Sequence, residues 1–181
     1  RLSPDVAVLD ADLTLGLPPA VTAMTGVDAM VHAIEAYTSR HKKNPLSDNL
    51  ARQALVLLND NIRTAVHEGS NQAARANMLL GAMLAGQAFA NAPVAAVHAL
   101  AYPLGGHYHI PHGLSNSLVL PSVLEFNAPE AASLYAELAP IVVGDGVSGS
   151  DEARTAAMVK ALRELIDDVQ LPATLEQARV K

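Results

Sequence analysis

Apolar side chains recur every three or four residues along most of the chain, and this spacing limits the fold more than any other feature of the sequence. A period near 3.6 residues places them on one side of an α-helix, whereas a half-buried strand needs alternation with a period of two. In residues 150–169, for example, Met158, Leu162, Leu165 and Ile166 are predicted to face inward. We find no convincing strand, repeat or low-complexity tract, so the sequence predicts an all-α fold, a helical bundle.

Proline, glycine and capping residues set the expected ends of the helices. The pair Pro18 and Pro19 favours the first turn of a helix that is broken or bent at Gly26 and then continues to Tyr37. Ser47 is expected to cap the next helix, which runs to about residue 66. Further helices are expected at about residues 72–90, 114–126, 129–142 and 150–169, with a loop at 144–149.

Two of these helices carry recognisable faces. In residues 47–66 the predicted buried stripe consists of Leu50, Ala54, Leu57 and Leu58. Small residues let helices approach closely, and residues 72–90 hold such a row beside a row of larger side chains. The large row is Leu79, Leu80, Met83 and Leu84, and the small row is Gly81, Ala82, Ala85 and Gly86.

Length, charge and the absence of cysteine exclude several classes of protein. The 181 residues, half of them hydrophobic, fit one domain. A formal charge of -6 without a basic run argues against nucleic acid or an anionic membrane as a partner and favours a small molecule or a protein. Without cysteine, any bound metal must use nitrogen and oxygen ligands, and a reducing cytoplasm is compatible. The most apolar region, 88–106, is too interrupted to span a bilayer.

The two ends of the chain differ from its middle. We expect residues 1–16, in which three aspartates stand between short apolar pairs, to be an extended lead-in or linker. Residues 17–181 are expected to form the helical metal-binding domain. Because the sequence starts at Arg1 rather than Met and stops abruptly at Lys181, we also expect a piece of a longer polypeptide that is truncated at its C-terminus.

Four of the seven histidines lie in residues 95–116. His98 follows an apolar helical run that Pro103 and two glycines are expected to break, His107 and His109 lie in the predicted loop, and His112 follows a proline at the start of a new helix. A single histidine on an apolar face is most often a core side chain with one backbone partner. Four together favour a site for a divalent metal, because imidazole is its commonest nitrogen ligand in proteins.

A second candidate lies in the helix before residue 37, where Asp28 and His32 are four residues apart. This spacing stacks both side chains on one helical face, so they can bind one ion or simply hydrogen-bond to each other. Glu35 shares that face and is expected to be a supporting or surface group rather than a ligand. Joined with His98 and His112, the pair gives one carboxylate and three imidazoles, a set suited to a divalent ion with an open position for substrate.

The sequence resembles the iron-containing (group III) alcohol dehydrogenase family from about Asp10 to Asn127. The segments that carry the resemblance are GVDAMVHAIEAY, the NP that follows it, and AVHALAYPLGG with PHGLSNSLVLPSVLEFN. It implies that Asp28, His32, His98 and His112 hold the metal, Fe2+ in the first place and Zn2+ as the other option. It also implies reversible oxidation of an alcohol to an aldehyde or ketone by hydride transfer, with a small alcohol or carbonyl substrate, in a cytoplasmic homo-oligomer.

Family members have two domains. A Rossmann-like N-terminal domain binds NAD or NADP, and an all-α C-terminal domain binds the metal. This chain resembles the second domain only, since the glycine-rich pyrophosphate-binding segment is absent from the 181 residues. The chain is therefore expected to be inactive on its own.

One position departs from the common pattern of the family. Many members carry a second histidine, proposed as a proton relay, where this chain has Tyr102. A phenol, with an ordinary pKa near 10, is a poorer acid-base group at pH 7, so Tyr102 is a candidate catalytic residue that acts through a water. His109 is the alternative route for the proton, and both side chains can equally be pocket lining.

Other functions stay open at this point. The chain could belong to a hydroxyacid-oxoacid transhydrogenase-like, glycerol dehydrogenase-like or dehydroquinate synthase-like enzyme of the same superfamily. A helical module that binds metal without catalysis is the alternative from another class. The sequence does not specify the substrate or the choice between NAD and NADP.

Overall fold

Six α-helices and one short 3-10 helix make up the protein in the computed structural model, which describes residues 5–93 and 95–180. No strand occurs within these ranges, which confirms the all-α prediction. The elements are η1 (Ala11–Thr14), α1 (Pro19–Tyr37), α2 (Pro45–His67), α3 (Gln72–Asn91), α4 (Ala96–Tyr108), α5 (His112–Val143) and α6 (Asp151–Asp168).

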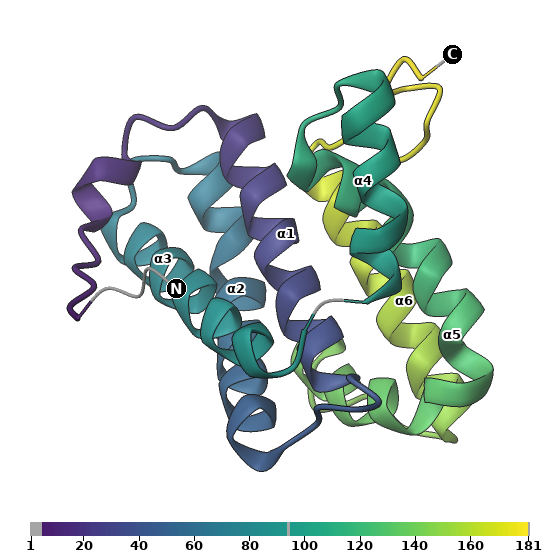
Figure 1. Ribbon diagram of the computed structural model, residues 1–181. Coiled ribbons are helices and arrows are strands. Elements are labelled where there is room, and N and C mark those ends of the chain that lie inside the picture. Colours follow the sequence, from purple (N-terminus) through teal and green to yellow (C-terminus); the bar gives the residue numbers. More distant parts are fainter. Residues whose placement is uncertain (1–4, 94, 181) are drawn as a thin grey trace.

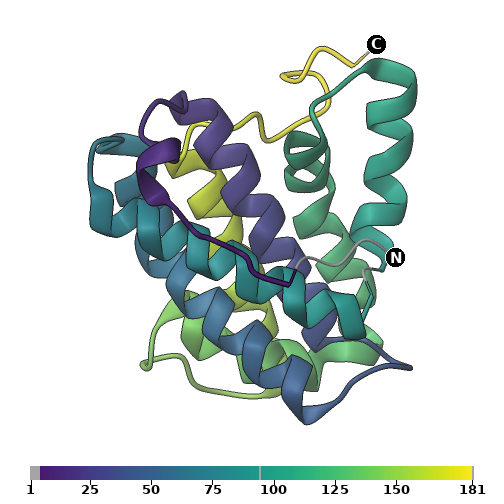
Figure 2. The same cartoon turned by 60° about the vertical axis from the view of Figure 1, so that its left-hand side comes forward.

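Helix α1 lies between two groups of helices (Figures 1 and 2). It packs against the antiparallel pair α2 and α3 on one side and against α5 on the other. Helix α6 packs along α5, and α4 returns onto the first part of α5. Because α1 is covered from several directions, its sequence is apolar nearly all round, as expected for a central helix.

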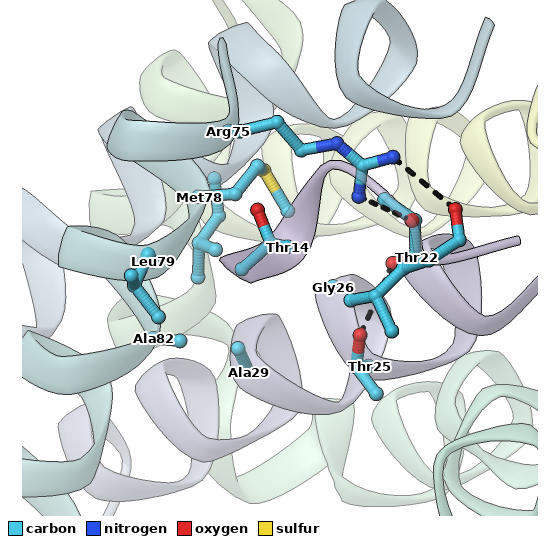
Figure 3. Close-up of a pocket in the computed structure, with 11 residues that line it drawn as sticks. Thr14, Thr22, Thr25, Gly26, Ala29, Arg75, Met78, Leu79 and Ala82 are labelled. Atoms are coloured by element: carbon cyan, nitrogen blue, oxygen red, sulfur yellow. Dashed lines mark hydrogen bonds between the residues drawn. The ribbon is translucent and has the colours of Figure 1, made fainter. Parts of the chain in front are cut away.

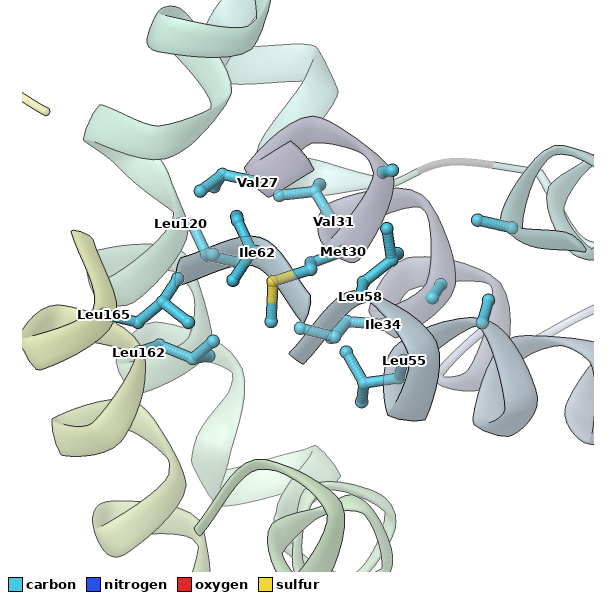
Figure 4. Packing of buried hydrophobic residues seen from close by; sticks show 14 of the residues in the cluster. Val27, Met30, Val31, Ile34, Leu55, Leu58, Ile62, Leu120, Leu162 and Leu165 are labelled. Atoms are coloured by element: carbon cyan, nitrogen blue, oxygen red, sulfur yellow. The ribbon is translucent and has the colours of Figure 1, made fainter. Parts of the chain in front are cut away.

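The hydrophobic core joins α1, α2, α5 and α6 into one cluster (Figure 4). Met30 and Ile34 of α1 are fully buried and meet Leu58 and Ile62 of α2. The predicted interruption of α1 at Gly26 was wrong, because α1 continues through it. A Cβ at Gly26 would lie only 2.8 Å from the side chains of Ile62 and Met78, so glycine there serves close packing rather than a bend.

Asn44 rather than Ser47 caps the second helix. Its side chain accepts a hydrogen bond of 2.9 Å from the backbone N–H of Ser47, and Pro45 occupies the first helical position. Ser150 caps α6, since its hydroxyl accepts a hydrogen bond from the backbone N–H of Ala153. The inward face predicted for α6 is buried as expected.

The close approach predicted for the small row of the third helix is confirmed at Gly81 and Ala85, whereas the buried stripe predicted for the second helix is right only at Ala54 and Leu58. The buried side of α3 holds Gly81 and Ala85, and a Cβ at Gly81 would lie 2.9 Å from Leu58 of α2. The larger row is less buried, and Leu80 is exposed. In α2, Leu50 and Leu57 are only partly buried, whereas the buried face includes Leu55, Leu58 and Ile62. Close backbone approach decides the α2/α3 contact.

The break predicted at Pro103 to Gly106 was also wrong. Helix α4 runs through these residues and ends at His109, which adopts the left-handed conformation (φ 56°) of a helix C-cap. Three residues, 109–111, therefore reverse the chain between α4 and α5. Helix α5 is likewise one helix, although two helices were predicted around Pro129.

The lead-in is extended over residues 5–10 but includes η1, which the sequence analysis did not predict. The buried guanidinium of Arg75 donates to the hydroxyl of Thr22 and to the carbonyl oxygen of Leu17 (Figure 3). It also donates to the carbonyl oxygen of Gly69. These bonds tie the start of α3 to the start of α1. The domain division at residue 16 stays a prediction.

Within the described residues, no single helix is long and apolar enough to cross a membrane; α3 and α4 meet that test only as a pair bent by 107°.

Prediction for the α1/α5 contact. A Cβ at Gly113 of α5 would lie 2.7 Å from the carbonyl carbon of Met24 in α1. Because backbone cannot move aside as a side chain can, Gly113→Ala should lower the free energy of unfolding by about 1–3 kcal/mol. Gly86→Ala on α3 is the control, since no atom lies within 4 Å of its Cβ, and it should be neutral or stabilise by about 0.5–1 kcal/mol. Urea unfolding measures both.

Candidate metal site

Three helices bring Asp28 and three histidines together. Asp28 and His32 lie one turn apart on α1, His98 is in the first turn of α4, and His112 begins α5. The Oδ1 atom of Asp28 lies 3.9 Å from His32 Nε2, 3.5 Å from His98 Nε2 and 3.7 Å from His112 Nε2. All four residues named by the sequence analysis therefore converge, whereas their role as metal ligands stays a prediction.

The short turn between α4 and α5 produces this convergence. His98 and His112 lie fourteen positions apart in the sequence, yet their ring centroids are 5.3 Å apart. The reversal at residues 109–111 returns the chain beside α4, and the missing side chain at Gly113 lets α5 approach α1. The site thus depends on a turn after α4 rather than on the break within α4 that we expected.

The donor set fits a divalent ion. Ligand atoms 2.0–2.3 Å from a tetrahedral ion are about 3.3–3.8 Å apart, and the separations measured from Asp28 Oδ1 lie close to this range. Asp28, His32 and His98 each offer one ligand atom within 4.8 Å of the others. His112 lies outside this mutually close group, although its Nε2 is 3.7 Å from Asp28 Oδ1. One carboxylate and three imidazoles suit iron or zinc better than the all-oxygen sites that calcium and magnesium prefer.

Glu35 supports His98 from behind. Its Oε2 atom lies 2.7 Å from His98 Nδ1, and its Oε1 atom accepts a 2.7 Å hydrogen bond from the backbone N–H of Val97. Both carboxylate oxygens are therefore in use, and the ring of His98 is held with Nε2 toward Asp28. Glu35 is buried rather than exposed, in keeping with the supporting role that the sequence analysis considered.

The electrostatics of the cluster favour a positive charge at its centre. Burial lowers the pKa of His98, but its hydrogen bonds to Asp28 and Glu35 and the charges of both carboxylates outweigh burial and raise the pKa to about 9. For Asp28, burial raises the pKa, yet the hydrogen bond to His98 and the nearby histidines lower it overall. Burial lowers the pKa of His32, which Asp28 only partly offsets.

Aromatic rings flank the site. Phe89 of α3 stacks on His32 with ring centroids 4.6 Å apart, and His32 stacks in turn on His98 at 4.8 Å. Tyr102 of α4 stacks on His112 at 5.9 Å and stands edge-on to His98 at 6.2 Å. Because the side chain of Tyr102 is 60% exposed, it lies where the site meets solvent.

The remaining histidines are exposed and lie elsewhere. His107 and His109 are at the end of α4, and His41 is in the loop before α2. His67 ends α2, where its Nε2 lies 2.9 Å from the carbonyl oxygen of Asp168. None of the four has a contact with Asp28 among the interactions of the described residues.

Asn116 was missed by the sequence analysis. It is fully buried on α5, one turn after His112, and its Nδ2 lies 2.6 Å from Asp28 Oδ1, 3.1 Å from His112 Nε2 and 3.3 Å from His98 Nε2. The available signal was its four-residue spacing from His112, the same spacing that had singled out Asp28 and His32.

Comparisons with known proteins agree with this geometry. The sequence model of the Fe-containing alcohol dehydrogenase family, C-terminal, matches residues 22–181. The chain therefore belongs to the Fe-containing alcohol dehydrogenase family and corresponds to its C-terminal part, as the resemblance predicted.

Individual relatives are similar over nearly all of the chain. Long-chain-alcohol dehydrogenase 1 of Geobacillus thermodenitrificans is 44% identical over 171 residues, which are 94% of this chain and 43% of the relative. A crystal structure of 1,3-propanediol oxidoreductase matches with a TM-score of 0.91 and 40% identity, covering 95% of this chain and 45% of the other. The structure of sulfoacetaldehyde reductase from Bifidobacterium kashiwanohense in complex with NAD+ matches with a TM-score of 0.86 and 30% identity. The match covers 98% of this chain and 45% of the reductase. The chain spans less than half the length of these relatives.

Prediction for His98. With a chelator present, the His98 ring should titrate near pH 9, because Asp28 and Glu35 favour its charged form. This added proton affinity stabilises the folded state fully below the ordinary value of 6.5 and is lost as the pH rises through about 9. NMR of the histidine rings, assigned with His98→Gln, measures the titration. Glu35→Gln should lower this pKa; a His98 ring that titrates at or below 6.5 in the unaltered protein would contradict the prediction.

Proposed function

We propose that this chain is the metal-binding catalytic part of an NAD(P)-dependent alcohol dehydrogenase that interconverts an alcohol and an aldehyde or ketone. The observation that carries the proposal is the Asp28 carboxylate, which lies within 3.9 Å of imidazole nitrogens from three helices in a chain of this family. The open side of the cluster at Tyr102 and His112 gives a small substrate access to it.

The carboxylate and the imidazoles contribute different kinds of ligand atom to the proposed site. Asp28 supplies the negative charge, while His32, His98 and His112 supply neutral Nε2 lone pairs. The chemistry that a divalent ion bound by these residues would supply is polarisation of the substrate oxygen, which would lower the pKa of an alcohol and favour hydride release to a nicotinamide. Glu35 accepts the proton on His98 Nδ1, which fixes the tautomer that leaves Nε2 free for the ion.

Two aromatic side chains line the route to this centre. Phe89 covers His32 and so shields one side of the cluster from water. The exposed Tyr102, stacked on His112, is the group we propose for passing a proton between substrate and solvent through a water. His109, the alternative route from the sequence, lies at the exposed end of α4.

The finer assignments rest on the family. Solved relatives include a sulfoacetaldehyde reductase in complex with NAD+, which supports a nicotinamide cofactor for this chain as well. We propose Fe2+ as the resident ion, with Zn2+ as the alternative that the same ligands accept. We propose a small alcohol or carbonyl compound as the substrate and a Rossmann-like domain outside residues 17–181 as the cofactor-binding part. We also propose that the enzyme is a homo-oligomer in the cytoplasm.

Prediction for the metal ligands. The purified chain should bind about one divalent ion per molecule, and His98→Ala or Asp28→Asn should abolish stoichiometric binding because each removes a ligand. His67→Ala is the control, since His67 is exposed at the end of α2. Elemental analysis gives the stoichiometry. An ion at 100 times its Kd should also stabilise the fold by about 2.7 kcal/mol.

Two results would decide against parts of this proposal. Equal metal content in the unaltered chain and His98→Ala would refute the ligand set. Stoichiometric metal without alcohol-dependent reduction of NAD+ or NADP+ by the intact enzyme would leave a binding module that does not catalyse the reaction.

Prediction for Tyr102. In the active enzyme, Tyr102→Phe should leave the metal content unchanged and lower kcat by roughly tenfold or less, because a phenol acting through water contributes less than a well-placed histidine. Steady-state kinetics with metal analysis tests this. A loss above about a thousandfold would mean that the hydroxyl transfers the proton directly.

A further inference from the structure

Asn116 occupies a position that the proposed ligand set does not account for. Its side chain has no exposed surface, and its amide nitrogen stands within 3.3 Å of atoms of three of the four proposed ligands. Desolvating an amide is costly unless its polar atoms find partners. The nitrogen of Asn116 has such partners, whereas its carbonyl oxygen has none within the described residues. The 2.6 Å contact to Asp28 Oδ1 is the shortest of the three, so the bond to this carboxylate dominates.

The four proposed ligands are held in different ways. His98 is almost fully buried and hydrogen-bonded through Nδ1 to Glu35. His32 is packed between the rings of Phe89 and His98. The side chains of Asp28 and His112 are 18% and 48% exposed, and the amide nitrogen of Asn116 lies within hydrogen-bond distance of both.

We infer that Asn116 is a positioning residue that holds the Asp28 carboxylate in the geometry the ion requires. This inference rests on the proposed function, because it assigns a role within the same site. Helix α5 then contributes both a ligand and, one turn later, the group that orients a ligand on α1. Asn116 and Glu35 act as a pair of supports, one for each side of the cluster.

The orientation of the amide follows from its neighbours. A carbonyl oxygen 2.6 Å from the Asp28 carboxylate would be repelled, so the amide nitrogen faces it and donates one hydrogen. The second hydrogen points to His112 Nε2 at 3.1 Å, which is nearer than His98 Nε2 at 3.3 Å. When an ion takes the Nε2 lone pair, the bond to Asp28 remains, because a carboxylate oxygen accepts more than one partner.

This arrangement lowers the cost of assembling the site. An ordered carboxylate loses less side-chain freedom when the ion binds than a mobile one would. Hydrogen bonds of this kind behind metal ligands are each worth about 10–100-fold in metal affinity. The same hydrogen bond draws electron density from Asp28 and so leaves the ion a stronger electrophile.

The test compares two substitutions of Asn116 with a neighbour on the same helix. Asn116→Leu keeps the branched shape in a somewhat larger volume and removes the amide, whereas Asn116→Ala removes the amide and leaves a cavity. Ser117→Ala is the control, because Ser117 is equally buried but its hydroxyl has no hydrogen-bond partner. Zn2+ affinity is measured by chelator competition, and Co2+ absorption reports the coordination geometry. Far-UV circular dichroism checks that each variant is folded.

Both Asn116 variants should bind Zn2+ about 10–100-fold more weakly than the unaltered chain and give an altered Co2+ spectrum, whereas Ser117→Ala should stay within about twofold. The two variants disturb packing in opposite ways, so a shared loss points to the amide. If a folded Asn116 variant keeps the original affinity and spectrum, the positioning role is wrong while the proposed function stands. If the unaltered chain binds neither ion, the proposed function fails and the role of Asn116 falls with it.

Discussion

The structure depends on one carboxylate that three imidazoles from three helices share. Asp28 lies on the central helix, so the rings of His32, His98 and His112 approach it from α1, α4 and α5. A half-buried carboxylate needs compensating positive charge or hydrogen bonds. The histidines around Asp28 supply the charge, and the amide of Asn116 donates a hydrogen bond. The supports around it, Glu35 and Asn116, come from α1 and α5, so the polar centre and the apolar core use the same helices.

Local patterns predicted much of this correctly. The helical period of the apolar residues gave the fold class and helix α6, since neither depends on distant contacts. The four-residue spacing of Asp28 and His32 and the histidines of residues 95–116 singled out the four side chains that converge, and the resemblance named the same four. Both kinds of signal are contained in short stretches of sequence.

The errors have a common cause, which is that contacts between helices override local preference. Gly26 was expected to break or bend the first helix, but the packing of α2 and α3 against α1 needs a residue without a side chain there. Pro103 lies inside α4, and the reversal occurs instead at His109, a residue that sequence alone does not mark for a left-handed cap. Asn116 was missed although it lies four residues after His112, because its contact with Asp28 spans 88 positions of sequence.

The close approach of Gly113 to Met24 has a mechanical consequence. The site lies on the seam between one group of helices, α1 to α3, and another, α4 to α6, and the backbone contact sets the width of that seam. Sliding or opening of one group against the other would separate His98 and His112 from Asp28 by the same amount. An ion bound across the seam would link the two groups of helices. The amide hydrogens of both groups would then exchange with solvent through the same opening reaction, and the two groups would unfold as one cooperative unit.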